Sequence, residues 1–87
     1  MPYMLVRHKV VDFDRWKKVF DSHTDAHIAA GMKIQHIMRN MEDPNEIVFM
    51  FELEDVERAK AFVYGDEVPG AQEEAGVADE PDIYFLK

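Results

Sequence analysis

Histidine is the residue type in this chain best suited to chemistry, because its ordinary pKa lets it take up or release a proton near neutral pH. His23 and His27 lie four residues apart in segment 12–31. Three aromatic residues precede them at alternating steps of three and four: Phe13, Trp16 and Phe20. Residues at this spacing share one face of a helix. The pattern therefore predicts an inward-facing helix wall that is aromatic at one end and carries two imidazoles at the other.

His8 is a third candidate, because it shares its strand parity with apolar residues: Met4, Val6 and Val10. If that parity faces the helix, His8 points toward His23 and His27 across the layer between sheet and helix. Buried imidazoles without an acidic partner tend to be neutral near pH 7, so they can accept a proton from an activated carbon acid or hydrogen-bond to a phenolate. We predict His8 or His23 as the catalytic base. The predicted substrate-binding residues are Trp16, Phe20, His27 and Tyr84.

Each of these residues also has a purely structural interpretation. A histidine on an apolar helix face is more often a hydrogen-bonded boundary residue than a catalyst, and Trp16 and Tyr84 could simply pack. The roles of two further residues depend on the register of a central hairpin, which the sequence leaves open. His36 shares parity with apolar neighbours, and Glu52 either faces solvent at a strand end or pairs with Arg39 or His36.

Other kinds of chemistry find little support in the residue pattern. His23 and His27 could share a metal ion, with His8 or Asp21 as a third ligand, but Thr24 stands where a zinc-peptidase motif needs glutamate. No glycine-rich elbow surrounds a hydroxyl nucleophile and no phosphate-binding loop follows a strand. Cysteine is absent, which excludes disulfides and thiolate catalysis. We therefore expect neither a metal nor another cofactor.

Composition restricts the class of partner. The 87 residues predict one domain, 1–87, because so short a chain cannot enclose two cores. The net charge of -8 disfavours nucleic acid and anionic membrane surfaces. The first ten residues resemble a strand and not a signal peptide, and no apolar run is long enough to span a membrane. We expect a cytoplasmic protein that binds no nucleic acid and no membrane.

The order of predicted elements indicates the fold class. Strands are expected at 3–10, 32–41, 46–53 and 81–87. One helix of about five turns is expected from Asp12, as its N-cap, to Gly31, and a second helix begins after Asp55. At most one short helix fits the acidic segment 66–80, around 70–75. This β-α-β-β-α-β order predicts a ferredoxin-like α+β fold, a four-stranded antiparallel sheet with helices on one face.

Two of the predicted strands, 46–53 and 81–87, do not alternate between apolar and polar residues. A sheet with one wet face should alternate, so both of its faces are expected to be covered. A second copy of the chain is the simplest cover, which predicts a homodimer through the sheet face. The alternative is a monomer that exposes an apolar patch to another partner or a ligand.

Three stretches carry a family resemblance: VRHKVVDFDRWKKVFDSH, AAGMKIQHIMRNMEDPNEIVFMFELEDVERAKAF and AGVADEPDIYFLK. Together they resemble the small antibiotic biosynthesis monooxygenase-like proteins of the dimeric α+β barrel superfamily, most of which are uncharacterised. The resemblance implies two sheets packed in a homodimer, with a pocket between each subunit's own sheet and helices. Activities in that superfamily include cofactor-independent oxygenation of anthrone-like phenols, haem degradation, polyketide cyclisation and lactone isomerisation.

Departures from the family's residue patterns reduce the number of these activities that the chain is expected to have. Haem-degrading members have a haem-ligating histidine on the second helix and a nearby tryptophan, whereas DVERAKAFVYG offers neither. Polyketide-cyclase-like barrels place a histidine and a tyrosine near the pocket, for which His8 and Tyr84 are a loose analogue. The resulting hypothesis is a cofactor-free monooxygenase or isomerase/cyclase acting on a planar aromatic or polyketide-like molecule. The alternatives are a non-catalytic ligand-binding or stress-associated dimeric domain, and a haem or metal binder.

Overall fold

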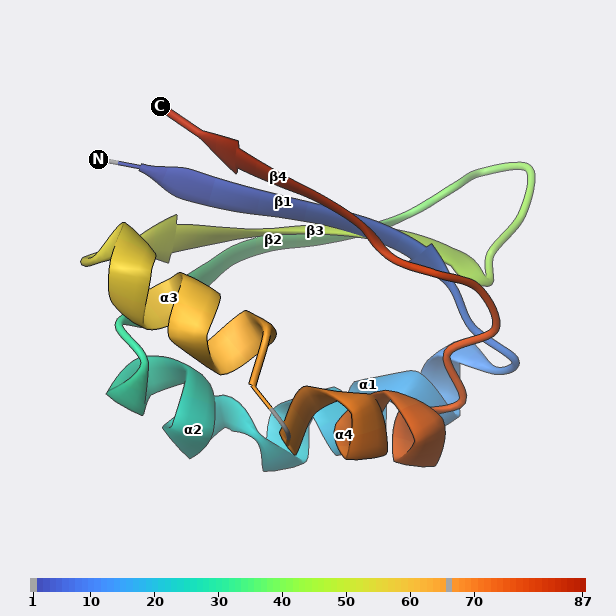
Figure 1. Ribbon diagram of the computed structural model, residues 1–87. Coiled ribbons are helices and arrows are strands. Elements are labelled where there is room, and N and C mark those ends of the chain that lie inside the picture. Colours follow the sequence, from blue (N-terminus) through green and yellow to red (C-terminus); the bar gives the residue numbers. More distant parts are fainter. Residues whose placement is uncertain (1, 66) are drawn as a thin grey trace.

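The computed structural model describes residues 2–65 and 67–87, and within them four strands form one antiparallel sheet (Figure 1). The strands are β1 (Tyr3–Lys9), β2 (Met32–Arg39), β3 (Glu46–Leu53) and β4 (Asp82–Leu86). The helices are α1 (Phe13–Ser22), α2 (Thr24–Ala29), α3 (Val56–Val63) and α4 (Glu67–Ala75), and they cover one face of the sheet. The strand order is β2-β3-β1-β4. The predicted ferredoxin-like α+β fold is therefore confirmed.

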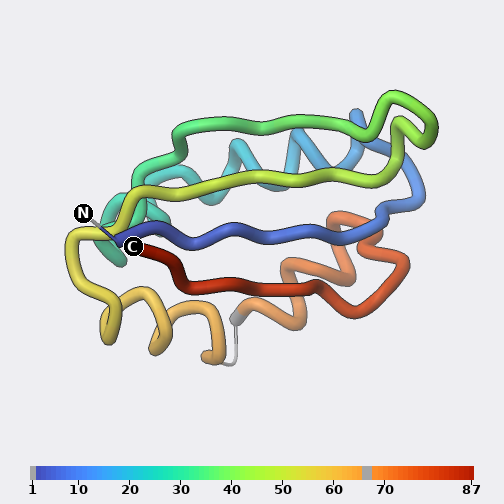
Figure 2. The backbone as a smooth tube through the Cα atoms, turned by 90° about the horizontal axis from the view of Figure 1, so that it is seen from above, coloured from blue at the N-terminus to red at the C-terminus, as the bar shows by residue number. Residues whose placement is uncertain are grey.

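The helices lie in two pairs under different halves of the sheet. Seen from above the sheet, α1 and α2 run on the side of β2 and β3, whereas α3 and α4 run on the side of β4 (Figure 2). β1 lies in the interior of the sheet, paired with β3 on one side and β4 on the other. The inward side chains of β3 pack against α1, where the ring of Phe49 contacts those of Trp16 and Phe20.

The single helix predicted from Asp12 to Gly31 is wrong, because the helix breaks at His23. This residue has φ -100° and ψ 11°, so α1 ends at Ser22 and α2 begins at Thr24. The hydroxyl of Ser22 donates to the carbonyl of Val19 at 2.6 Å, and that of Thr24 donates to the carbonyl of Asp21 at 2.8 Å. Such bonds offer the backbone an alternative to the helical ladder. The break turns His23 into a corner between two helices.

The two predicted N-caps behave differently. Asp55 caps α3 as predicted, since its side chain accepts from the backbone N–H groups of Glu57 and Arg58 at 2.9 and 3.3 Å. Asp12 occupies the N-cap position of α1 as predicted, with extended backbone, but the expected hydrogen bond from its side chain to the first helical N–H groups is not formed. Asn45 Oδ1, from the β2–β3 turn, accepts from the N–H of Phe13 at 3.2 Å instead. The start of α1 is thereby fastened to the hairpin.

The acidic segment forms a longer helix than the sequence predicts. α4 begins at Glu67, and Pro69 lies in its first turn, where a backbone N–H has no intrahelical acceptor to lose. Gly76 has φ +76°, a left-handed conformation that ends the helix. Arg15 of α1 donates from Nε to the carbonyl of Glu74 at 3.0 Å. α4 is thus held against α1 at its C-terminal end.

A β-bulge decides the register that the sequence left open. The β2–β3 pairing shifts between Ile34 and His36, so that Ile34 pairs with Phe51 and His36 pairs with Met50. His36 consequently shares the outer face of the sheet with Met50. Glu52 is also on this outer face, paired across the strands with Lys33 and Tyr3.

Arg39 lies at the opposite end of β2 from Lys33, on the inner face, with its guanidinium carbon 4.0 Å from the ring centroid of Phe13. It also donates to the carbonyl of Pro44 at 2.8 Å. Arg39 and Glu52 therefore lie on different faces and do not pair.

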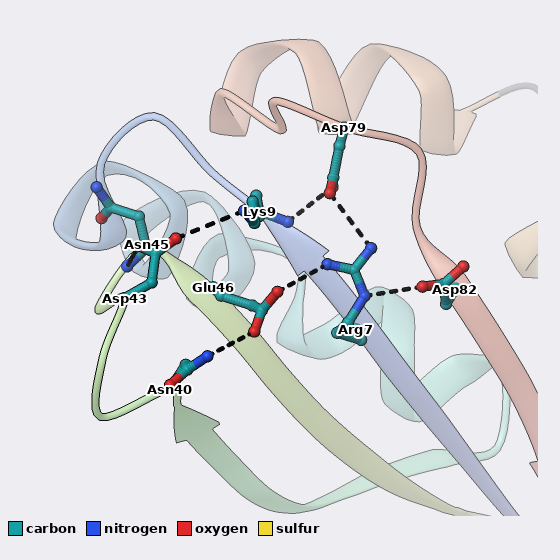
Figure 3. Close-up of polar contacts among 8 residues, drawn as sticks. All are labelled: Arg7, Lys9, Asn40, Asp43, Asn45, Glu46, Asp79 and Asp82. Atoms are coloured by element: carbon teal, nitrogen blue, oxygen red, sulfur yellow. Dashed lines mark hydrogen bonds and ion pairs between the residues drawn. The ribbon is translucent and has the colours of Figure 1, made fainter.

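An ion cluster on the outer face fastens the segment after α4 to β1 (Figure 3). The guanidinium of Arg7 lies 3.1 Å from Glu46, 3.2 Å from Asp79 and 2.8 Å from Asp82. Asp79 also accepts from the backbone N–H of Lys9 at 2.7 Å. The hydrogen bond from the backbone of Lys9 is the largest cause that lowers the pKa of Asp79, and the hydrogen bond and charge of Arg7 lower it further. In turn, the hydrogen bond to Asp82 is the largest cause that raises the pKa of Arg7.

None of the described helices is both long and apolar enough to cross a membrane. The core lies between sheet and helices, and its inward side chains from β3 are almost inaccessible: Ile47, Phe49, Phe51 and Leu53. One polar side chain, His8, is buried among the described core residues.

The two aspartates at N-cap positions provide a matched test of local helix capping. We expect Asp55→Ala to lower the free energy of unfolding by about 1 kcal/mol, because two backbone N–H groups of α3 lose their acceptor. Asp12→Ala should change it by less than about 0.5 kcal/mol, because its side chain caps nothing. Denaturant unfolding measures both values. Equal losses in the two variants would contradict the capping assignment.

Candidate functional site

A partly open cavity of about 130 Å³ lies between the sheet and the helices. Side chains from all four strands line it on the sheet side, and side chains from all four helices line it on the helix side. Among the described residues that line it, most are apolar and four are polar: His8, His23, His27 and Gln72. The structure thus brings the three histidines singled out by their spacing to one cavity.

His8 is the most deeply buried of these polar residues, with 4 % of its surface exposed. Its ring lies edge-on to Trp16, with centroids 5.8 Å apart, and 5.4 Å from the ring of Phe49. Neither ring nitrogen has a hydrogen-bond partner among the described residues. A buried polar group in that state costs about 1–3 kcal/mol, which native structures seldom tolerate without a functional reason.

Burial also sets the protonation state of His8. The pKa of His8 is lowered from 6.5 to about 4, and desolvation is the largest cause. The charge of Asp79 has a smaller effect that raises the pKa, and the charge of Arg7 has a smaller effect that lowers it. The imidazole is therefore neutral at pH 7 and has one N–H donor and one unprotonated nitrogen. A neutral imidazole is the form that can accept a proton or a hydrogen bond from a ligand.

His27 occupies an aromatic box within the same cavity. Its ring centroid lies 4.9 Å from that of Phe20, 5.2 Å from Phe51 and 5.7 Å from Phe62. Desolvation, followed by a smaller electrostatic effect of His23, lowers its pKa from 6.5 to about 4. His27 is consequently a second neutral imidazole, whereas His23 lines the cavity from the corner between α1 and α2.

Trp16 and Phe20 form the wall that their spacing predicted. Their rings are stacked with centroids 4.8 Å apart, and both residues line the cavity. Phe49 and Phe51 of β3, which the sequence placed only in a strand, also line the cavity, and they pack directly against this pair: the centroids of Phe20 and Phe49 are 5.4 Å apart and those of Phe20 and Phe51 are 5.9 Å apart. The four rings therefore form one continuous aromatic wall, and a flat ligand in the cavity would stack against it from one side.

Tyr84 does not belong to the cavity. It pairs with Leu5 on the outer face of the sheet and is 54 % exposed, while its neighbour Ile83 points inward and lines the cavity. The alternation of side chains along β4 is the physical reason, because successive residues of a strand face opposite sides. The proposed pairing of His8 with Tyr84 at a pocket is therefore not present.

The contribution of α4 was missed by the sequence reasoning. Four of its residues line the cavity at helical spacing: Val68, Ala71, Gln72 and Ala75. This i, i+3, i+4, i+7 pattern was a usable signal. Pro69 and Gly70 concealed it, because both residues are unfavourable inside a helix.

Within the described residues, no three histidine, aspartate or glutamate side chains group closely enough to share a metal ion. Among the described residues, His23 and His27 therefore have no third side chain with which to bind a metal ion. Both line the cavity.

Solved structures with the same fold extend over nearly the whole chain. One is a "putative antibiotic biosynthesis monooxygenase" from Bordetella bronchiseptica, with 12% identity and a TM-score of 0.79, matching 99% of this chain and 94% of the other. A protein of the same description from Caulobacter crescentus CB15 has 18% identity and a TM-score of 0.71, matching 98% and 86%. A conserved protein from Methanosarcina mazei Go1 has 11% identity and a TM-score of 0.73, matching 99% and 90%.

No protein-family model and no curated protein matches the chain. At these identities, the structural likeness establishes a shared fold, the fold of the antibiotic biosynthesis monooxygenase-like proteins. Function has to be argued from the cavity itself.

The buried imidazole of His8 predicts a specific acid sensitivity. The unfolded chain takes up a proton at this residue near pH 6.5, whereas the folded protein does so only near pH 4. The unfolded state therefore binds more protons between these values, and the free energy of unfolding falls as the pH falls through that window, by about 3 kcal/mol for His8. Asp79 does not contribute to this loss, because its pKa in the folded protein is lowered below the ordinary value of 3.8 and therefore lies outside this pH window.

Denaturant unfolding at steps of pH measures this loss. We expect His8→Phe to be less sensitive between pH 6.5 and 4 than the unsubstituted protein, with a residual slope from His27. Identical slopes in the two proteins would show that His8 is not buried in its neutral form.

Proposed function

We propose that this protein binds a small planar aromatic molecule in the cavity between its sheet and helices, and that it acts on the molecule without a cofactor, as a monooxygenase or an isomerase. The observation that carries this proposal is His8, a neutral, buried imidazole without a partner, in the wall of an otherwise apolar cavity. A ligand that donates to an unprotonated nitrogen of His8 would recover the hydrogen bond that the fold leaves unmade.

The chemistry that follows is removal of a proton from an activated carbon or hydroxyl group. His8 takes the proton, and the resulting carbanion or phenolate is stabilised by conjugation with its own ring. In an isomerase, the imidazolium returns the proton to a different atom. In a cofactor-free oxygenase acting on an activated CH₂ group, the carbanion reacts with dioxygen, so that one oxygen atom becomes a carbonyl and the other leaves as water.

The walls of the cavity suit this chemistry. The rings of Trp16, Phe20, Phe49 and Phe51 pack against one another on one side of the cavity, where they would offer a flat ligand an aromatic surface to stack on and exclude water. Exclusion of water strengthens the hydrogen bond to His8 and protects a reactive anion. The names of the structural neighbours agree with an oxygenase, and they support this proposal by likeness of fold.

The second candidate is a ligand-binding domain without catalysis, and the aromatic box around His27 favours it. A neutral imidazole enclosed by three phenylalanine rings can recognise a flat ligand without moving a proton. A haem binder is less well supported. The cavity of about 130 Å³ is smaller than the roughly 300 Å³ from which pockets for drug-sized ligands begin.

Substitution of His8 tests the catalytic role. In oxygen-uptake and product assays with dihydroxyaromatic compounds, we expect His8→Ala to lower turnover by about 10²-fold or more, the contribution typical of a general base. His36→Ala is the matched control, because His36 lies on the outer face of the sheet, and its turnover should be unchanged.

The outcome of this assay separates the two candidates. Turnover that survives in both His8→Ala and His23→Ala would remove the catalytic proposal. Thermal stabilisation by an aromatic compound without turnover would favour the binding domain.

We also propose that two copies pack through the outer face of the sheet. Apolar side chains on this face come from all four strands: Tyr3, Leu5, Met38, Val48, Met50, Tyr84 and Leu86. Met38, Tyr84 and Leu86 are between 43% and 54% exposed in the single chain. Their burial in a dimer is favourable at roughly 25 cal/mol per Å² of apolar surface. The lack of cysteine is compatible with the reducing cytoplasm, where we propose that the dimer acts.

Light scattering on the purified protein tests this association. We expect the mass of a dimer at micromolar concentration, and the mass of a monomer for Met50→Lys, because a charge would be buried at the centre of the apolar face. Ile28→Lys is the control, since Ile28 is 63% exposed on α2 and away from this face. A stable monomer of the unsubstituted protein would contradict the dimer.

A further inference from the structure

Removal of a proton from a bound molecule, as proposed above, creates a negative charge inside the cavity. The electron pair of the broken bond stays on, or is delocalised to, an oxygen atom of the ligand, which becomes a phenolate or an enolate. No lysine or arginine is among the described residues that line the cavity. A charge in apolar surroundings is costly unless hydrogen bonds stabilise it. The proposed step therefore needs a hydrogen-bond donor that faces the cavity and the new oxyanion.

Gln72 is the lining residue best suited to this role. The polar side chains that line the cavity are three imidazoles and the Gln72 amide, and His8 among them is the proposed base. A neutral imidazole has a single N–H, whose position depends on the tautomer. The amide of Gln72 carries two N–H donors that do not depend on pH. Gln72 can therefore donate to an oxyanion without taking part in the proton transfer.

The backbone places Gln72 toward the end of β1 that carries His8. The carbonyl of Gln72 accepts from the backbone N–H of Val77 at 3.0 Å, and Val77 forms an antiparallel bridge with Val10. Val10 follows His8 by two residues, and both are buried on the inner side of the sheet. In agreement, α4 runs below the half of the sheet in which β1 ends (Figure 1). Gln72, Val77 and His8 all line the cavity.

The position of α4 is fixed by contacts on either side of Gln72. Ala75, one turn further along the same helix face, is buried in the core with 4% of its surface exposed. The guanidinium of Arg15 holds the carbonyl of Glu74 against α1. The carboxylates of Glu73 and Glu74 are exposed and do not line the cavity, so they do not oppose a negative charge there. A donor held in this way can stabilise a new charge with little rearrangement.

We propose that Gln72 is a catalytic residue, whose side-chain amide donates a hydrogen bond to the oxyanion that forms when His8 removes a proton from the ligand. This inference rests on the proposed function, because it concerns the same step. The proton stays on His8, and the electron pair of the broken bond resides on the ligand oxygen that the amide binds. The substrate class is consequently a phenol, or a carbonyl compound with an acidic C–H group next to the carbonyl.

A chromophoric phenol tests the inference without knowledge of the natural substrate. The probes are 4-nitrophenol, whose phenolate has its own visible absorption, and 4-nitroanisole, its methyl ether, which has no proton to lose. Both have one ring, in keeping with a cavity of about 130 Å³. Absorbance across a pH series gives the acid dissociation constant of the bound 4-nitrophenol, and calorimetry gives the affinity for each compound.

Three variants connect the ionisation of the probe to Gln72. Gln72→Met keeps the length of the side chain but removes the amide. We expect it to lower the acid dissociation constant of bound 4-nitrophenol about 10-fold, because a hydrogen bond to a charged acceptor is stronger than one to a neutral acceptor. Its affinity for 4-nitroanisole should stay within about 2-fold, because this compound forms no oxyanion. Gln72→Glu has a carboxylate that repels the phenolate, so it should lower the constant further and provides a second test.

Gln35→Met is the matched control. Gln35 is the other glutamine of the chain, and it is exposed on β2 and does not line the cavity. We expect this variant to leave the ionisation of 4-nitrophenol and both affinities unchanged.

The outcomes separate this inference from the proposed function. An unchanged ionisation of bound 4-nitrophenol in Gln72→Met would overturn the role of Gln72, and so would an equal loss of affinity for both compounds, which indicates packing only. In either case, a loss of phenolate in His8→Phe would still support the proposed function. Failure of both compounds to bind the unsubstituted protein would overturn both proposals.

Discussion

The burial of an unpartnered imidazole in an apolar layer is the constraint on which the rest of this structure depends. His8 points inward from β1 because both of its strand neighbours at the same parity are apolar, and Trp16 of α1 closes over it. The fold loses hydration and both hydrogen bonds of the ring at this point. In return, it keeps a neutral base at pH 7 inside a cavity walled by aromatic rings.

The two faces of β1 have complementary roles because adjacent residues point in opposite directions. Arg7 holds three carboxylates on the outer face, and Asp79 among them fastens the segment that follows α4. Val77 and Pro81 on that segment line the cavity next to the inward side of the same strand. An exposed ion cluster of this kind contributes modestly to stability, but its geometry holds the wall of the cavity in place.

The sequence predicted much of the site and the general fold because both depend on short-range periodicity. The spacing of Trp16, Phe20 and His27 predicted that they face the same layer, which they do although His27 lies on a separate helix, and the strand parity of His8 pointed it toward that layer. Three features were not predicted from the sequence. The hydroxyls of Ser22 and Thr24 bond back to the preceding turn and break the helix, Asn45 caps α1 from a distant turn, and the β2–β3 bulge turns His36 outward.

What the sequence by itself determined is the four strands, the order of strands and helical segments along the chain, and the inward side of the periodic segments, because local sterics and the burial of apolar side chains act over a few residues. The tertiary structure alone decided that Tyr84 faces away from the cavity, that α4 supplies Gln72 to it, and that neither nitrogen of His8 meets a partner in the described chain. These properties depend on register and on contacts between segments far apart in sequence. Only the packed chain specifies such contacts.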